Sequence, residues 1–276
     1  MLPPREKEKS SELIMKNTEK ARHATPTRTL AVTAVSVLWM ATQLAAYEGD
    51  RDPRSHEIHS RSRPLPPQVD PGSHVSLPAP SDAIVLFDGS DFSQWQHSGG
   101  RDVEWKREDE AMRVVPGTGD IETRRRFGDV QLYVEFETYK DSPGKDQTRS
   151  NSGIFFGPYE VQVLDSYDNR TYADGMVASI FGQYPPLVNA SRPPGQWQSF
   201  NIIYRAPRFQ DGEVVAPARI TVFHNHILVQ DHEELVGPTT WGQRTPYSEH
   251  GDVQIRLQDH RDDPIRFRNI WVRELH

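Results

Sequence analysis

Residues 151–165 read NSGIFFGPYEVQVLD, and this segment is the most informative part of the sequence. Alternate side chains of an extended strand share a face, so Glu160 and Gln162 are predicted to point the same way, roughly 7 Å apart. Val161 and Val163 then point the other way, into a core. A carboxylate beside an amide on one sheet face indicates the floor of a polar binding site. An ordinary solvated outer face is the alternative.

Residues 253–275, VQIRLQDHRDDPIRFRNIWVREL, predict a strand, a turn and a returning strand. The turn is expected at residues 261–264, where Pro fixes the backbone and Asp caps it. Before the turn, four residues are expected to share one face: Gln254, Arg256, Gln258 and His260. After it, regular alternation is expected to separate Ile265, Phe267, Asn269 and Trp271 from Arg266, Arg268, Ile270 and Val272.

The chain from Ser81 onward favours an all-β sandwich. Short apolar runs alternate there with turns rich in Gly, Pro, Asp and Asn. Asp211-Gly212 and His224-Asn225 indicate hairpin turns. This pattern alone does not choose one type of sandwich over another.

Composition excludes several classes of protein. The chain has 276 residues, enough for one sizeable β-domain plus extensions. Its net charge of −7 and the lack of a basic stripe with interleaved aromatic residues argue against a nucleic-acid binder. It contains no cysteine, which excludes disulfides, cysteine nucleophiles and thiolate metal sites.

The N-terminal third divides into two expected segments. Residues 1–46 comprise a basic region and then an uncharged run, 30–46, that ends in small residues, as a signal peptide does. That run is short for a membrane span, which needs about 20 residues. A start at Met15 gives a more usual signal peptide, and a secreted or periplasmic location, or an N-terminal anchor, is expected. Residues 47–80 contain seven prolines and predict a disordered or extended linker before the domain at 81–276.

Several short motifs occur in a fixed order along the chain: Phe87-Asp88-Gly89, Asn151-Ser152-Gly153-Ile154, Glu160-Val161-Gln162-Val163-Leu164-Asp165, Pro194-Gly195-Gln196-Trp197, Leu257-Gln258-Asp259-His260 and Phe267-Arg268-Asn269-Ile270. Together they resemble the 3-keto-disaccharide hydrolase family over roughly residues 82–275. The resemblance implies a secreted bacterial protein with a concanavalin A-like jelly-roll sandwich of two antiparallel sheets. His226 and Arg261 stand where the family usually has Gly.

The family resemblance also implies a chemistry. Its substrate carries a ketone at carbon 3 of a glucose unit, which acidifies the hydrogen on carbon 2. A base can then remove that hydrogen, the glycosidic bond breaks by elimination, and water adds back. Such an enzyme needs a base, a donor or metal at the ketone oxygen, and an acid for the leaving group.

Site residues follow from the family segments. The expected catalytic residues are Glu160, His260 and Asp165, and the expected substrate-binding residues are Asn151, Gln162, Arg149, Gln258 and Trp241. Two structural alternatives stay open, in which Asp165 caps the turn after its strand and Asp259 stabilises its own turn. No cofactor is certain, although acidic and His side chains could hold a divalent metal.

Two other functions remain open at this stage. The run from Glu160 to Asp165 is similar to a degraded form of the Glu-x-Asp-x-x-Glu motif of laminarinase-like glycoside hydrolases. A non-catalytic, lectin-like carbohydrate-binding module is the other alternative, because the jelly roll hosts many binders. In each case the expected partner is a carbohydrate, and the sequence leaves the oligomeric state open.

Overall fold

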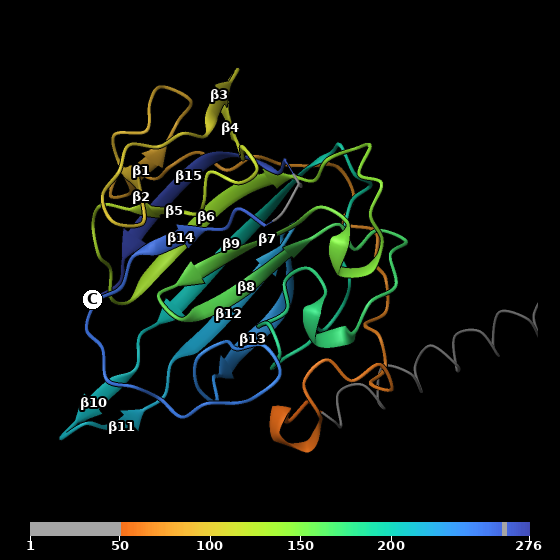
Figure 1. Cartoon of the computed structure of the whole chain (residues 1–276), viewed down its shortest axis with the longest axis vertical. Helices are drawn as coiled ribbons and strands as arrows, with labels where there is room; N and C mark the ends of the chain where they lie inside the picture. The colour runs from red at the N-terminus through yellow and green to blue at the C-terminus, as the bar shows by residue number, and fades with distance from the viewer. Residues whose placement is uncertain (1–50, 261–263) are drawn as a thin grey trace, which may run out of the picture. The chain divides into compact units, whose positions relative to one another are not determined.

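The strands between residues 84 and 274 form two antiparallel sheets packed face to face, in a computed structural model that describes residues 51–260 and 264–276 (Figure 1). The larger sheet has eight strands, in the order β13-β12-β9-β6-β15-β4-β3, with β1 also paired to β15. Their bounds are β1 Ile84–Phe87, β3 Lys106–Glu108, β4 Ala111–Arg113, β6 Val130–Glu137, β9 Trp197–Arg205, β12 Arg219–His224, β13 Ile227–Glu234 and β15 Arg266–Glu274. The predicted all-β sandwich is confirmed.

The smaller sheet has five strands, in the order β2-β5-β14-β7-β8. They are β2 Trp95–His97, β5 Ile121–Thr123, β14 Ile255–Leu257, β7 Asn151–Phe156 and β8 Tyr159–Leu164. A separate ribbon pairs β10, Arg208–Gln210, with β11, Glu213–Ala216. Three short 3-10 turns complete the described part: η1 Pro53–Ser55, η2 Asp146–Thr148 and η3 Ala173–Gly175.

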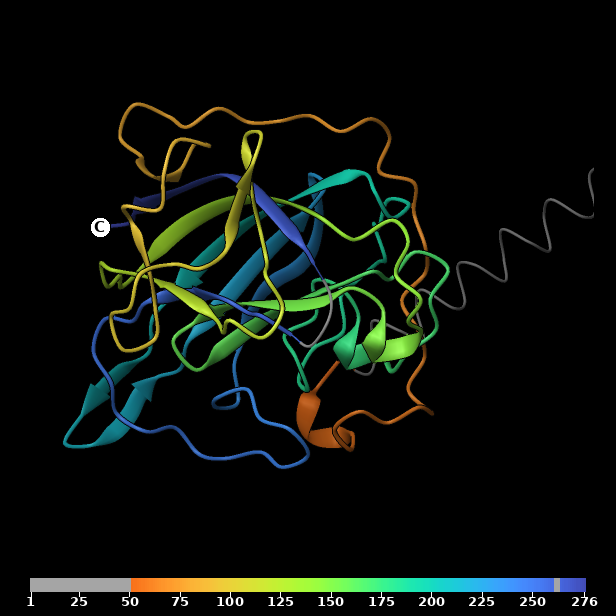
Figure 2. The same cartoon turned by 45° about the horizontal axis from the view of Figure 1, so that its top comes forward.

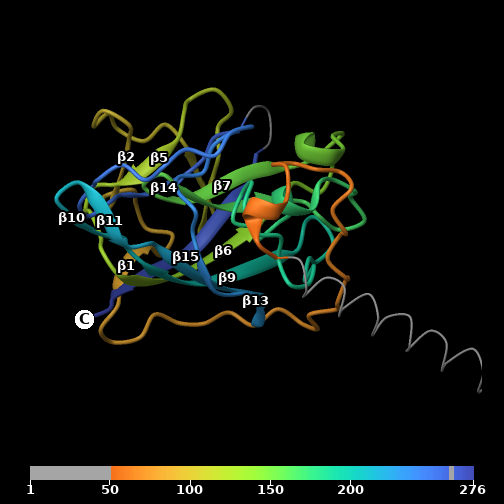
Figure 3. The ribbon, with the colours of Figure 1, turned by 90° about the horizontal axis from the view of Figure 1, so that it is seen from below.

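The hydrophobic core lies between the two sheets, which Figure 3 shows as two layers. From the smaller sheet, Val161 and Val163 are fully buried, as their alternation predicted. Side chains of the larger sheet, such as Phe136 and Phe200, complete the same core. Burying one such side chain stabilises the fold by about 1.5–3 kcal/mol.

The β7–β8 hairpin fixes which residues leave the core. Its two-residue turn is Gly157-Pro158, and Gly157 has a φ of 56°, a left-handed conformation that suits glycine. The register pairs Phe155 with Glu160 and Gly153 with Gln162. Directly paired residues share a face, so this group lies on the outer face of the smaller sheet.

Strand β8 is the last of its sheet, and a loop lines its other side. The Ala178 amide donates to the Gln162 carbonyl at 2.8 Å, and the Gln162 amide donates to the Ser179 carbonyl at 3.0 Å. The Phe181 amide donates to the Glu160 carbonyl at 3.2 Å. The backbone of β8 is therefore hydrogen-bonded on both sides around Glu160.

Strand β15 departs from the regular alternation expected for residues 265–272. Asn269 has a φ of 46°, and the pairing with β6 shifts between Arg268 and Trp271. This bulge reverses the faces beyond it. Ile270 therefore joins the core, and Trp271 stacks on Tyr133 with ring centroids 5.2 Å apart. The predicted alternation is wrong past Arg268, and residues 261–263 of the predicted turn lie outside the described residues.

Both predicted hairpins are present. Asp211 and Gly212, with φ of 55° and 84°, connect β10 to β11. The β12–β13 turn is at Asn225 and His226, one residue later than expected, with φ of 50° and 69°. His226 thus has a left-handed backbone conformation, which glycine adopts more readily than other residues.

Residues 51–80, here called the N-terminal arm, follow the outside of the sandwich in an extended path (Figure 2). The predicted linker is either disordered or extended. Residues 51–80 are extended in the structure. Arg63 donates to the Gln183 carbonyl at 3.1 Å, and the Val69 amide donates to the Asn189 carbonyl at 3.0 Å. Polar contacts therefore hold the arm along its length.

The expected signal or anchor segment, residues 1–46, lies outside the described residues. In the part of the chain that is described, no helix has the length and apolar character needed to cross a membrane.

Candidate functional site

The outer face of the smaller sheet carries the polar group that the sequence predicted. Glu160 and Gln162 are only 6% and 1% exposed. The alternative of a solvated outer face is therefore wrong, because loops cover this part of the sheet. Burying a carboxylate costs free energy unless the group is paired, hydrogen-bonded or neutralised by a proton.

Gly153 makes room for the Glu160 carboxylate. A Cβ atom on Gly153 would lie 2.5 Å from Glu160 Oε1 and 2.6 Å from Cε2 of Phe155. Both distances are well inside van der Waals contact. The absence of a side chain at position 153 is thus a steric requirement of the carboxylate position.

Burial raises the pKa of Glu160 to about 8. Arg256 opposes this shift and Asp120 adds to it. Among the described residues, no hydrogen bond to the carboxylate oxygens accompanies these effects. Glu160 is therefore a carboxyl group that gains and loses its proton near neutral pH, which is the property of a general acid or base.

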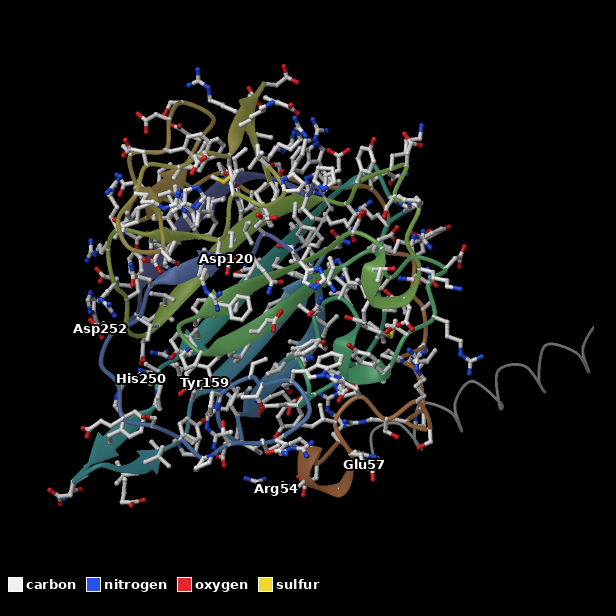
Figure 4. All side chains as sticks on the ribbon, viewed as in Figure 1. Arg54, Glu57, Asp120, Tyr159, His250 and Asp252 are labelled. Atoms are coloured by element: carbon white, nitrogen blue, oxygen red, sulfur yellow. The ribbon has the colours of Figure 1, made fainter. Side chains whose placement is uncertain are left out.

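Arg256, on β14, is held beside this carboxyl group. It forms an ion pair with Asp120, which is labelled in Figure 4. Its guanidinium lies over the Phe155 ring, 3.9 Å from the centroid. Arg256 is thus a fixed cation on the same sheet face as Glu160.

Two loops are attached to the backbone of Glu160. Its amide donates to Thr239 Oγ1 at 3.0 Å, and its carbonyl accepts from the Phe181 amide at 3.2 Å. The first loop leads into Trp241, which is 73% exposed. Glu160 and Trp241, predicted from distant segments, are therefore brought into the same region of the molecule.

Gln162 and Asn151 are brought together as predicted, and they bond to each other. Gln162 Nε2 donates to Asn151 Oδ1 at 2.8 Å. Asn151 Nδ2 donates in turn to the Gln147 carbonyl at 2.8 Å. These contacts tie η2 to the sheet beside Glu160, and a contact of either residue with sugar stays a prediction.

Asp165 and Arg149 form an ion pair at the end of β8, with 2.7 Å between Nε and Oδ2. Asp165 is 1% exposed, and its Oδ1 accepts from the Tyr167 amide at 3.1 Å. The capping role left open for Asp165 is therefore present in the structure. Its catalytic role, and sugar binding by Arg149, stay predictions.

His260 and Gln258 follow β14 beside β7. The Gln258 amide donates to the Gly153 carbonyl at 3.0 Å, and His260 is half-buried. Asp259 Oδ2 accepts from the Gly119 amide at 2.8 Å, which ties it to the loop before β5, and stabilisation of its own turn stays a prediction. Catalysis by His260 and sugar binding by Gln258 remain predictions.

No three His, Asp or Glu side chains converge to hold a metal ion within residues 51–260 and 264–276. Two other acidic residues of this region have partners of their own, since Asp120 pairs with Arg256 and Asp165 with Arg149. The possible divalent metal therefore stays a prediction.

Sequence reasoning missed several residues around Glu160. Alternation along residues 254–260 places Arg256 on the site face, and this signal could have found it. Asp120 and Tyr172 lie in loops, and His59 lies in the arm. No periodic pattern marks such positions.

Comparisons with known proteins agree with this fold. One similar crystal structure is that of a Parabacteroides distasonis protein described as a candidate glycosyl hydrolase, with 44% sequence identity and a TM-score of 0.71. The match covers 77% of this chain and 93% of the Parabacteroides chain. A second such protein from the same organism is 19% identical, with a TM-score of 0.51, over 71% of this chain and 94% of its own, which shows the fold alone. No curated protein matches the chain.

The family comparison covers most of the sandwich. Residues 82–273 match the domain described as 3-keto-alpha-glucoside-1,2-lyase-like. This range includes Glu160, Arg256 and His260, and it supports a carbohydrate-active function. The resemblance expected from the short motifs is confirmed: the chain belongs to the 3-keto-alpha-glucoside-1,2-lyase-like family.

Proposed function

We propose that this protein cleaves the glycosidic bond of 3-keto-glycosides by elimination and subsequent addition of water, with Glu160 as the base. The observation that carries this proposal is the buried Glu160 carboxyl group with a pKa of about 8. The family assignment supports the class of substrate. The position of Glu160 on an outer sheet face, beside a fixed arginine, supports the chemistry.

The reaction requires two proton transfers. The base takes the hydrogen from carbon 2, and the electrons of that C–H bond form an enolate with the carbon 3 ketone. The enolate then forms the double bond between carbons 1 and 2 as the bond from carbon 1 to the glycosidic oxygen breaks. The leaving oxygen takes a proton from an acid. Addition of water across the double bond gives the 3-keto sugar and completes a net hydrolysis.

Each step has a proposed residue. Once ionised, Glu160 is a strong base, because no hydrogen bond from the described residues stabilises its charge. Arg256 stabilises the enolate oxygen as negative charge develops there. His260, which follows β14 next to β7, is proposed to donate the proton to the leaving oxygen. Four further residues are proposed to position the sugar, either directly or through the loops that they hold: Asn151, Gln162, Gln258 and Arg149.

The direct test is incubation of the purified protein with a 3-keto-disaccharide and with its unoxidised parent, each with and without a chelator. We expect cleavage of the keto sugar alone, and loss of this cleavage in Glu160→Gln. Glu108→Gln is the matched control, because Glu108 pairs with Arg113 at the edge of the other sheet. A chelator effect would add a metal to the mechanism. Full activity in both Glu160→Gln and His260→Ala would show that the assigned site is wrong.

The two alternative functions give different results in the same experiment. Cleavage of both sugars would favour an ordinary glycoside hydrolase. The ion pair of Asp165 with Arg149 disfavours that reading, because a laminarinase-like mechanism uses the second carboxylate for chemistry. Binding without cleavage would favour a lectin-like module, which the exposed Trp241 ring would also suit.

A further inference from the structure

A cluster of four rings lies next to the loops that hold Glu160, and one ring comes from the N-terminal arm. His59 of the arm lies 4.1 Å from Tyr172, 4.6 Å from Phe181 and 4.6 Å from Trp241, measured between ring centroids. Phe181 and Trp241 also stack, at 6.3 Å. His59 thus makes the three shortest ring contacts of the cluster.

Specific polar contacts hold the arm at this cluster. The His59 amide donates to Asp174 Oδ2 at 2.9 Å, and its Nδ1 lies 3.4 Å from Asp174 Oδ1. Arg61 forms an ion pair with Asp146, and Arg244 donates to the Pro53 carbonyl. These residues of the arm precede the family domain, which begins at residue 82.

The cluster is close to Glu160. Phe181 donates its amide to the Glu160 carbonyl at 3.2 Å, and the loop of Trp241 bonds the Glu160 amide through Thr239 at 3.0 Å. The charge of Glu160 is among the effects that raise the pKa of Tyr172. The Tyr172 hydroxyl is buried, and no described residue bonds it. A buried hydroxyl without a protein partner is unusual and is available to a ligand or water.

The cluster also has an open side. Trp241 is 73% exposed despite its contacts with His59 and Phe181. A pocket of about 580 Å³ lies between the arm and the Trp241 loop, and Arg54, Glu57 and Arg244 line it. Arg54 and Glu57 are labelled in Figure 4, on the arm. An exposed ring beside charged side chains suits a sugar, whose C–H face is apolar and whose rim of hydroxyls is polar.

We propose that residues 53–63 of the arm complete the substrate site, and that the exposed Trp241 ring, held in place by His59, forms a platform for the sugar on the leaving side of the glycosidic bond. This inference rests on the proposed function for the reaction, but the platform itself is a binding site for a neutral pyranose. His59, whose side chain is only 10% exposed, acts through Trp241 as a positioning residue. It takes no part in proton transfer.

The test compares a 3-keto-disaccharide with methyl 3-keto-glucoside, whose leaving group is too small to reach a platform. In His59→Ala and Trp241→Ala we expect KM for the disaccharide to rise about tenfold, and kcat/KM for the methyl glycoside to fall several-fold less than kcat/KM for the disaccharide. A tenfold change corresponds to about 1.4 kcal/mol. Leu65→Ala is the matched control, because Leu65 is a half-exposed arm residue outside the cluster.

A second variant separates loss of the ring from loss of the fold. His59→Phe keeps an aromatic ring and loses the contact of Nδ1 with Asp174. We expect it to restore most of the disaccharide affinity that His59→Ala loses. Equal losses on both substrates, or no loss in either variant, would overturn the proposal.

A binding measurement makes the result independent of catalysis. The unoxidised disaccharide is titrated against the full protein while tryptophan fluorescence is followed. A saturable change that disappears in Trp241→Ala and weakens in His59→Ala supports the platform even if no keto sugar is cleaved. Cleavage of keto sugars without any such change would leave the proposed function intact and reject the platform.

Discussion

At the scale of the residue, the properties of Glu160 follow from where its carboxyl group lies. Position 160 is 6% exposed, and burial raises the pKa to about 8. At pH 7 only about a tenth of such groups are ionised, whereas an exposed glutamate is almost fully ionised. Glu160 is therefore mostly protonated at pH 7, and its carboxyl group ionises as the pH rises through about 8.

The first prediction concerns the pH dependence of cleavage. If Glu160 is the base, kcat/KM for a 3-keto-glycoside should rise about tenfold per pH unit below pH 8 and level off above it. Glu160→Gln should lower kcat by at least about a hundredfold and remove this limb of the profile. Initial rates from about pH 6 to pH 9 check it. A profile that falls with pH would instead make Glu160 an acid.

The second prediction concerns stability. In the native state Glu160 has a pKa of about 8, whereas in the unfolded state it has the ordinary value of 4.5. Between these two pH values the native state therefore binds more protons than the unfolded state. This contribution to the free energy of unfolding is fully present below the ordinary pKa and is lost as pH rises through about 8. Glu160→Gln should remove it. Thermal unfolding of both proteins across this range should give curves that diverge with pH, and parallel curves would contradict the buried assignment.

At the scale of the element, the β7–β8 hairpin and β14 together set the geometry around Glu160. β7 supplies Gly153 and Phe155, and β14 supplies Arg256. Variants of the strands therefore test the geometry separately from the chemistry.

Gly153→Ala is the first such variant. Its new methyl group would lie 2.5 Å from Glu160 Oε1, so the carboxylate must move. We expect kcat to fall about tenfold or more, while the melting temperature changes little, since the end of a side chain moves more readily than backbone. Gly251→Ala is the control, because nothing lies within 4 Å of its added Cβ. Unchanged kcat in Gly153→Ala would mean that the carboxylate position does not matter.

Arg256→Gln is the second variant that tests the geometry around Glu160. It removes the cation that lowers the Glu160 pKa and leaves Asp120, which raises it, without its ion-pair partner. The midpoint of the pH–rate profile should therefore move upward from about 8, together with a loss of rate. Arg113→Gln, which breaks the Glu108 pair on the other sheet, serves as the control. A midpoint that stays in place would remove Arg256 from the site.

Strand alternation predicted much of this arrangement. It placed Glu160 and Gln162 on one face, Val161 and Val163 in the core, and Arg256 on the same face as Gln258 and His260. It failed at Asn269, where a bulge reverses the faces, because a bulge depends on the partner strand. It could not find Asp120, Tyr172 or His59, since loops and the arm reach the site only through contacts between distant parts of the chain.

At the scale of the whole molecule, the arm belongs to the folded structure although it contributes little regular secondary structure. Arg63 is 5% exposed and donates to the Gln183 carbonyl at 3.1 Å. Arg51 donates to Gln230 Oε1 at 3.0 Å. The arm therefore needs the sandwich for its conformation, and the sandwich surface is incomplete without the arm.

A prediction at this scale is that Arg63→Ala loosens the arm. The change leaves the Gln183 carbonyl without this donor, which should cost about 1–3 kcal/mol. Trypsin cleavage after Arg61, whose side chain is 63% exposed, should then become faster. The parent protein and Leu65→Ala should both be cut slowly there under the same conditions. Equal cleavage rates in all three proteins would mean that the arm does not depend on this contact.

The loop along β8 links two properties of the protein. An uncovered edge strand invites pairing with another chain and aggregation, and the backbone of residues 178–181 closes this edge. The same loop presents the Phe181 ring to the rings of His59 and Trp241. Ala178 and Ile180 of this loop are fully buried in the core, and its backbone cannot open without exposing the unpaired edge of β8. The segment that keeps this sheet edge covered is thus the same segment that positions the Phe181 ring, so a change that loosens one would disturb the other.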